Sequence, residues 1–253
     1  GPEEMRCVGE TDFVHGVAAM SRSGLYGDSR LCTGIFSTAD LRLGKGAEPV
    51  LEAHLAASDN FRGIRSAFPG DLNDQFLEGF ALLQKHNLSF DNWSPDYTRL
   101  PTLAALANRF PGVTVIVNHL GGKIDPDASE EEIADWRRCI DAVAACPNAV
   151  MKTGGAQMRI GPWEPSYHMH QAGSPLSSEA FCDLLYPFYH YAMDAFGPDR
   201  CMFESNFPVD MVSCSYNVLW NSFKLLTAGF SADEKAKLFH DTATRIYRLD
   251  ASA

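Results

Sequence analysis

The residues of this sequence that could do chemistry follow short apolar runs, where the strands of a sheet would end. They are Arg65, Asp91, His119, Lys152 and the cluster Glu204-Ser205-Asn206. In barrels, the carboxyl ends of parallel strands form the edge that carries the active site. Because side chains alternate along a strand, we expect three groups to share a face: Val115 with Val117 and His119, Val150 with Lys152, and Met202 with Glu204 and Asn206. The sequence therefore predicts polar groups converging on one mouth.

His119 ends the run VIVNH and precedes two glycines. It could act as a metal ligand or as an electrophile. It could also simply end a strand and bond a neighbouring carbonyl group, and a single histidine by itself favours this second interpretation.

The two cations also allow two interpretations each. Arg65 could hold a carboxylate or a carbonyl oxygen with two parallel hydrogen bonds, or it could pair with Asp91 at the lip of a barrel. Lys152 could polarise a substrate oxygen or neutralise Glu204 inside the barrel, and the pairing is slightly favoured.

The run MFESNFPVD is the most informative segment. Placing Glu204, Ser205 and Asn206 on a strand otherwise built from Met and Phe is hard to explain by packing, which favours a functional role. The alternative is that Ser205 and Asn206 only cap the next helix, which is predicted to begin near Ser215 or earlier.

Other motifs are weaker. His168 and His170 form an H-x-H that would suit zinc, but they lie in a Gly/Pro/Ser-rich segment without a matching carboxylate or thiol, so a solvated loop is favoured. No ligand role is expected for the histidines on predicted helices, His15, His54, His86 and His240. The sequence has no G-x-S-x-G, P-loop or G-x-G-x-x-G motif, which argues against hydrolase-fold esterases, phosphate-cradling enzymes and dinucleotide-binding proteins.

The elements that must position these residues alternate in type. Short apolar runs alternate with segments of helical period, which is typical of βα units around a parallel sheet. Strands are predicted at 30–40, 61–67, 87–93, 113–121, 148–155 and 200–208. Helices are predicted at 9–21, 48–58, 74–86, 100–110, 129–146, 177–196 and 234–249, with capping boxes at Ser129 with Glu132 and at Ser231 with Glu234. A long irregular segment, 156–175, follows the fifth strand, where barrels place active-site loops.

The composition excludes several classes of partner. The chain has 21 basic and 32 acidic residues, a net charge of -11 and no basic run, which argues against binding to nucleic acid or anionic lipid. No apolar stretch approaches the roughly 20 residues of a membrane span, and the first ten residues lack the apolar region of a signal peptide, so a cytoplasmic protein is predicted. The seven cysteines lack C-x-x-C spacing and are expected to be reduced core thiols.

Five segments together resemble a known family. FRGIR, LSFDNW, VIVNHLGG, NAVMKTGG and RCMFESNFPVD, in this order and spacing, resemble the amidohydrolase-2 group of metal-dependent barrel hydrolases, in particular the branch of sugar lactonases and 2-pyrone-4,6-dicarboxylate lactonase. The resemblance implies an α/β fold, a (β/α)8 TIM barrel that forms a single domain over residues 1–253. Such a barrel needs eight strands. With about six βα units predicted, we expect a barrel truncated at the N-terminus.

The resemblance also implies roles for individual residues. In such enzymes, a water activated by a metal or by a carboxylate attacks an ester or amide carbonyl. His119 matches the histidine that ends strand six, Arg65 and Lys152 match polar positions on strands four and seven, and Asn206 stands where most members have the Asp of an S-D-x-P motif on strand eight. An amide cannot accept a proton, so Asn206 could orient water but cannot be the general base. Glu204 is then the candidate for the missing carboxylate.

The leading hypothesis is a hydrolase that acts on a small lactone, ester or amide, carboxylated or sugar-derived. Its expected catalytic residues are His119, Glu204 and Asn206, its substrate-binding residues Arg65, Asp91, Lys152 and Ser205, and its metal ligand, for zinc or manganese, His119. Family members open with an H-x-H on strand one, which this sequence does not contain at its start. A catalytically degenerate barrel with a binding or regulatory role is therefore the rival, and a fragment of a longer enzyme is a third reading. A homo-oligomer could cover the open sheet edges.

Overall fold

The computed structural model describes residues 1–67, 72–125, 128–155 and 177–249, and its centre is a six-stranded parallel sheet. The strands are β1 (Ile35–Ser37), β2 (Phe61–Ala67), β3 (Ser89–Trp93), β4 (Val115–Val117), β5 (Ala149–Thr153) and β6 (Cys201–Phe203). Each strand pairs with the next along the chain, as repeated βα units require. All six predicted strands are confirmed, most of them shorter than expected.

Helices follow the strands in the predicted order. They are α1 (Val8–Arg22), α2 (Glu48–Ala57), α3 (Asp74–Lys85), α4 (Leu100–Arg109), α5 (Glu130–Ala144), α7 (Ser178–Phe196), α8 (Tyr216–Leu226), α9 (Ala232–Ala236) and α10 (Thr242–Tyr247). A π-helical turn, Lys237–Asp241, joins α9 to α10. Both predicted capping boxes are present, so the local signals at Ser129 and Ser231 set the starts of α5 and α9.

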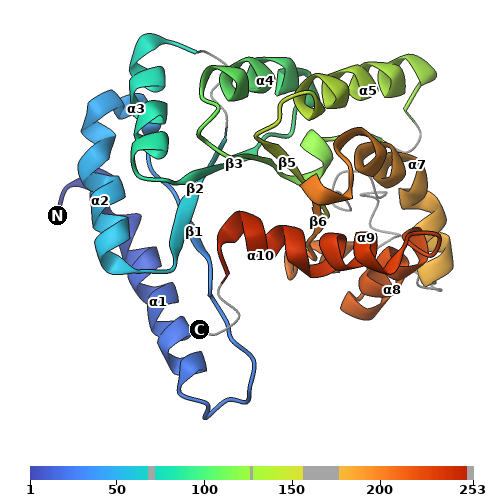
Figure 1. The fold of residues 1–253 in the computed structure, drawn as a ribbon, viewed down its shortest axis with the longest axis horizontal. Coiled ribbons are helices and arrows are strands. Elements are labelled where there is room, and N and C mark those ends of the chain that lie inside the picture. The colour runs from blue at the N-terminus through green and yellow to red at the C-terminus, as the bar shows by residue number, and fades with distance from the viewer. Residues whose placement is uncertain (68–71, 126–127, 156–176, 250–253) are drawn as a thin grey trace.

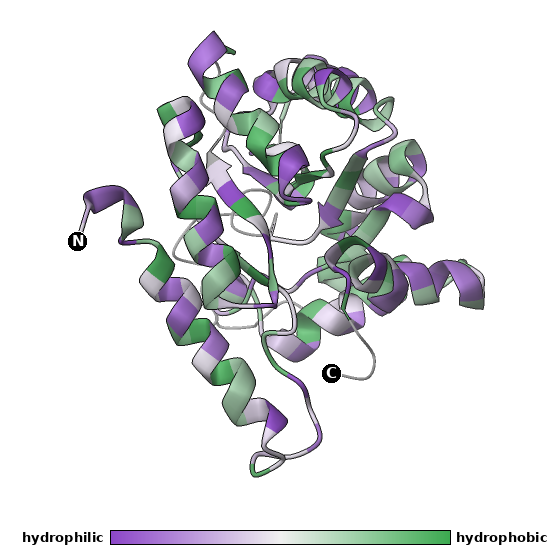
Figure 2. Ribbon diagram, turned by 60° about the vertical axis from the view of Figure 1, so that its left-hand side comes forward, coloured by the Kyte–Doolittle hydropathy of each residue, from purple (hydrophilic) through white to green (hydrophobic). Residues whose placement is uncertain are grey.

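The outer face of the sheet packs against these helices in one large apolar core. Figure 1 shows α2, α3, α4, α5 and α7 following one another around the outside of the strands. Ile64, Phe90, Val115 and Val117 are fully buried in this core, together with Trp136 of α5. The helices carry both apolar and polar residues along their lengths, as Figure 2 shows, which is typical of surface helices with one buried side.

The inner face of the sheet is covered differently. Ile116, Val150 and Met202 form a separate apolar cluster against which Ala243 and Tyr247 of α10 pack. Figure 1 places α10 between β1 and β6, the two strands at the ends of the sheet. In a closed barrel the interior is filled by side chains from the strands on the far side. In this open, partial barrel, α10 lies against the inner face instead.

One predicted alternation is wrong. Val115 and Val117 lie in the outer core, but His119 does not share their face. The strand ends at Val117, and His119 and Leu120 adopt left-handed φ angles of 56° and 54°. Because this turn reverses the alternation, the His119 side chain comes to lie among polar groups and not in the outer core.

Two further observations bear on the composition. All seven cysteines are free thiols, and five of them are buried, as predicted. Among the described residues, no helix is long and apolar enough to cross a membrane.

Candidate active site

Five of the predicted residues come together at the carboxyl edge of the sheet and are called the polar ring here. They are Arg65 on β2, Asp91 on β3, His119 after β4, Lys152 on β5 and Glu204 after β6. The strand register explains the gathering, because Arg65 lies opposite Asp91 and Lys152 lies opposite Met202, two residues before Glu204. With alternate side chains pointing to opposite faces, these residues project inward while their neighbours fill the outer core.

His119 is the most constrained member of the polar ring. It is 3% exposed, and its Nδ1 lies 2.8 Å from Glu204 Oε1 and 3.1 Å from the carbonyl oxygen of Gly154. Both of these atoms are acceptors, so the ring proton of the neutral imidazole belongs on Nδ1. Nε2 is then an acceptor, and Arg65 Nη2 donates to it at 3.2 Å. His119 is thus held in one tautomer with its basic nitrogen beside a guanidinium.

Two glycines make this arrangement possible. A Cβ atom at Gly155 would overlap the His119 ring, and one at Gly154 would overlap Glu204. Gly155 also has a positive φ of 68°, which favours glycine. The segment NAVMKTGG therefore ends in two glycines because the histidine and the carboxylate pack directly against its backbone.

Lys152 joins the two carboxylates of the polar ring. Its Nζ lies 2.8 Å from Asp91 Oδ2 and 3.6 Å from Glu204 Oε2. Burial alone would lower the pKa of Lys152, but the two carboxylates outweigh it and hold that pKa well above its ordinary value. Burial also raises the pKa of Asp91, and Lys152 offsets part of that rise. Lys152, not Arg65, is therefore the ion-pair partner of Asp91.

Glu204 stays ionised in this setting. Burial opposes its ionisation, but the charge of Lys152, the hydrogen bond from His119 and the charge of Arg65 outweigh burial and lower its pKa to about 2. A carboxylate with so low a pKa is a weak base. It is suited to hold His119 and not to take a proton from water.

Ser205 and Asn206 lie beside the polar ring and have other partners. Ser205 Oγ accepts a hydrogen bond from the Phe207 N–H at 3.3 Å, and Asn206 Nδ2 donates to Asp210 Oδ1 at 2.7 Å. Neither side chain bonds a ring residue within the described part of the chain. The alternative that they cap the next helix is wrong, because Ser215 is the N-cap of α8.

Two residues near the polar ring were not predicted as site residues. Tyr247 of α10 lies with its OH 3.4 Å from Asp91 Oδ2 and its ring centre 5.5 Å from Lys152 Nζ. Burial raises the pKa of Tyr247, which keeps the phenol protonated. Asp210 is fully buried, and burial raises its pKa to about 7. Asp210 could have been predicted from the sequence, because it is the last residue of the motif ESNFPVD. Tyr247 could not, because it reaches the polar ring from the far end of the chain.

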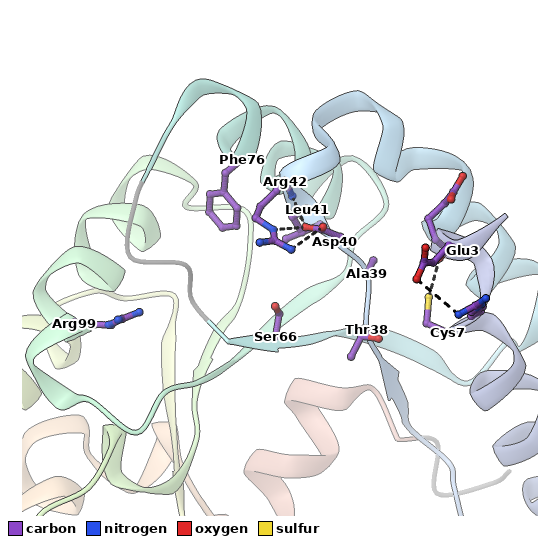
Figure 3. Close-up of a pocket in the computed structure, with 12 residues that line it drawn as sticks. Glu3, Cys7, Thr38, Ala39, Asp40, Leu41, Arg42, Ser66, Phe76 and Arg99 are labelled. Atoms are coloured by element: carbon purple, nitrogen blue, oxygen red, sulfur yellow. Dashed lines mark hydrogen bonds and ion pairs between the residues drawn. The ribbon is translucent and has the colours of Figure 1, made fainter.

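A cavity of about 710 Å³ opens at the carboxyl ends of β1 and β2, and none of the five polar-ring residues lines it. Figure 3 shows its lining, with Ser66, the residue after Arg65, pointing toward the space beneath Arg42. Asp40 holds Arg42 by two hydrogen bonds of 2.8 and 2.9 Å. Small-molecule sites typically have volumes of roughly 300–1,000 Å³, so the cavity has the right size for a small substrate.

The polar ring does not fit a divalent metal ion. Both nitrogens of His119 face protein groups, and the guanidinium at Nε2 would repel a cation. Among the described residues, three ligand-type side chains gather within 4.8 Å only at Glu48, Glu52 and His86, on α2 and at the end of α3. That group contains no residue of the polar ring, and Lys85 already pairs with Glu48. His168 and His170 lie outside the described residues.

Comparisons with known proteins agree with this architecture. Residues 34–249 match the family model described as amidohydrolase. The uncharacterized protein y4mH of Sinorhizobium fredii is 34% identical over 95% of this chain and 75% of its own length, and an L-fucono-1,5-lactonase of Burkholderia multivorans is 28% identical over 85% and 71%. A solved amidohydrolase from Burkholderia multivorans with bound zinc superposes with a TM-score of 0.76 at 24% identity, covering 96% of this chain and 80% of the other.

Proposed function

This chain belongs to the amidohydrolase family, and we propose that it hydrolyses a small, sugar-derived or carboxylated lactone. The observation that carries the proposal is the placement of His119 between the Glu204 carboxylate and the Arg65 guanidinium. The lactonase relative supports a lactone as the substrate.

His119 is the general base in this proposal. The Gly154 carbonyl accepts from Nδ1, and Glu204 Oε1 lies 2.8 Å from the same nitrogen, so the ring proton stays on Nδ1. Nε2 carries no proton, and it takes one from a water molecule when Arg65 bonds the substrate carbonyl in its place. The carboxylate also stabilises the imidazolium that forms, as the aspartate does in a Ser-His-Asp triad. This division of labour suits the low pKa of Glu204, which orients the base without competing for the proton.

Arg65 supplies the positive charge at the reacting carbonyl group. Its guanidinium already lies at hydrogen-bond distance from Nε2, so a carbonyl oxygen bound to Arg65 lies close to the base. The water oxygen bonds to the carbonyl carbon, negative charge develops on the carbonyl oxygen, and Arg65 stabilises it. The ring C–O bond then breaks, His119 returns its proton to the departing oxygen, and the product is a hydroxy acid.

Lys152 and Asn206 complete the proposed site. Lys152 keeps Glu204 ionised and in place, and Asp91 is the second carboxylate that pairs with the Lys152 ammonium group. Asn206 orients the water and does not take its proton, since an amide has no basic site for it.

No step of the proposed mechanism uses a metal ion. Zinc in the solved relative makes zinc or manganese the natural cofactor to test. The donor set of the polar ring does not fit such an ion, because a guanidinium occupies the side of His119 that would face it.

The test is turnover of a panel of five- and six-membered aldonolactones, including L-fucono-1,5-lactone, followed by proton release. We expect His119→Gln to lower kcat/KM by roughly 10²–10⁴-fold, the usual share of general-base catalysis. The matched control, His240→Gln, changes an exposed imidazole on the surface and should leave activity unchanged. Turnover that is no higher in the unaltered protein than in His119→Gln would contradict the proposal and favour the degenerate barrel.

A further inference from the structure

Asp210 is a buried carboxyl group beside the polar ring that the proposed mechanism does not use. It lies in a 3-10 turn, Val209–Val212, and is 0% exposed. Its Oδ1 accepts the hydrogen bond from Asn206, whereas Oδ2 is buried and has no hydrogen-bond partner within the described ranges. A buried polar atom without a partner costs free energy, so its presence at a site calls for a compensating role.

The backbone ties Asp210 to Asn206 a second time. The Asp210 N–H donates to the Asn206 carbonyl oxygen at 3.1 Å, so main chain and side chain both link the two residues. Asn206 itself has a left-handed φ of 52°, a conformation that asparagine tolerates better than most residues. The Asn206 side chain therefore leaves the end of β6 in a direction that the turn determines.

A carboxamide has a donor end and an acceptor end on the same carbon atom. Asp210 Oδ1 offers only lone pairs, and this holds even when Oδ2 carries a proton, because Oδ1 is then the carbonyl oxygen of the acid. The Asn206 NH2 group must face Asp210. Its Oδ1 consequently points the other way, and it accepts no hydrogen bond from any described residue.

We propose that Asp210 is a positioning residue that locks the Asn206 amide with its oxygen presented at the carboxyl edge of β6, as an acceptor for the attacking water. The inference rests on the proposed function. Without Asp210 the amide can turn over and present its NH2 group, which cannot accept a hydrogen bond from water. The pair thereby supplies one half of what a carboxylate would do at this position: it orients the water, while His119 takes the proton.

The activity test compares Asp210→Asn and Asp210→Ala with the unaltered protein. In Asp210→Ala we expect kcat to fall about ten- to a hundredfold, the order of magnitude for losing one such hydrogen bond, with KM changed less than about twofold. Asp210→Asn should lower kcat less, because its amide oxygen can still accept from the Asn206 NH2 group. The double variant Asn206→Asp with Asp210→Asn reverses the direction of the hydrogen bond and again presents an oxygen, so its kcat should exceed that of Asp210→Ala. Asp141→Asn is the matched control, since Asp141 accepts a hydrogen bond from Tyr191 at the surface.

A second measurement does not depend on turnover. The side-chain NH2 protons of Asn206, assigned in a nitrogen-15 NMR spectrum by their loss in Asn206→Asp, should exchange slowly with solvent and should exchange faster in Asp210→Ala. If the protein hydrolyses no lactone but these protons are protected by Asp210, the proposed function fails and the locked amide stands. Unchanged exchange in Asp210→Ala, or unchanged kcat in both Asp210 variants of an active enzyme, would overturn the inference.

Discussion

The two faces of the same six strands bury different things. On β2 and β3, the outward residues Ile64 and Phe90 join the apolar core, while their neighbours Arg65 and Asp91 project into the polar ring. The outer face is stabilised by apolar burial against the helices. The inner face combines a small apolar cluster with buried charged groups, in which Lys152 pairs with both Asp91 and Glu204. Substitutions of outward residues should therefore change stability alone, whereas substitutions of the inward charged residues should change activity as well.

The largest expected effect lies in the outer core. Phe80 of α3 is fully buried and packs against Phe90. Phe80→Ala should lower the free energy of unfolding by about 3–5 kcal/mol through lost burial and the cavity left behind. Urea unfolding measures this change, and kcat per folded molecule should stay the same. The exposed Phe13 is the control, because Phe13→Ala should change stability by less than about 0.5 kcal/mol.

The next-largest effect tests whether Lys152, Asp91 and Glu204 on the inner face stabilise one another. Lys152→Met leaves Asp91 and Glu204 without their shared cation, and breaking such a buried pair typically costs about 3 kcal/mol or more. Adding Asp91→Leu to Lys152→Met removes one of the uncompensated carboxylates and should recover part of the stability. Equal unfolding midpoints for the single and double variants would show that the charges do not support one another.

A smaller effect should appear at acid pH. The pKa of Glu204 is lowered in the folded protein, so its contribution to stability is fully present above the ordinary carboxyl pKa of about 4.3 and is lost as pH falls toward 2. Unfolding measured between pH 5 and pH 2.5 should show this loss, and Glu204→Gln should reduce the slope of stability against pH. If Glu204→Gln leaves this slope unchanged, groups other than Glu204 cause the loss of stability at acid pH.

The smallest expected effect is that of metal removal. Since Arg65 lies at Nε2 of His119, dialysis against a chelator should leave kcat/KM within about twofold and the unfolding midpoint unchanged. Elemental analysis before and after dialysis checks that any zinc or manganese was removed. A large loss of activity that added zinc restores would mean that the inner face holds a metal after all.

Local signals predicted much of the fold. Apolar runs located all six strands, and capping boxes at Ser129 and Ser231 located the starts of α5 and α9, because these depend on residues close in the chain. The alternation of side chains along a strand correctly predicted that Lys152 and Val150 share a face of the sheet. It failed at His119, because strand β4 ends before that residue and the chain turns through left-handed φ angles.

The sequence by itself determined which residue types stand at the strand ends and that a parallel sheet would gather them. Only the tertiary structure decided their partners: Arg65 with His119, Lys152 with Asp91, and Asn206 with Asp210. It also brought Tyr247 within 3.4 Å of Asp91, across 156 residues of chain. The physical reason is that alternation sets the face on which a side chain lies, whereas its partner depends on register, on turns and on distant segments that no local pattern encodes.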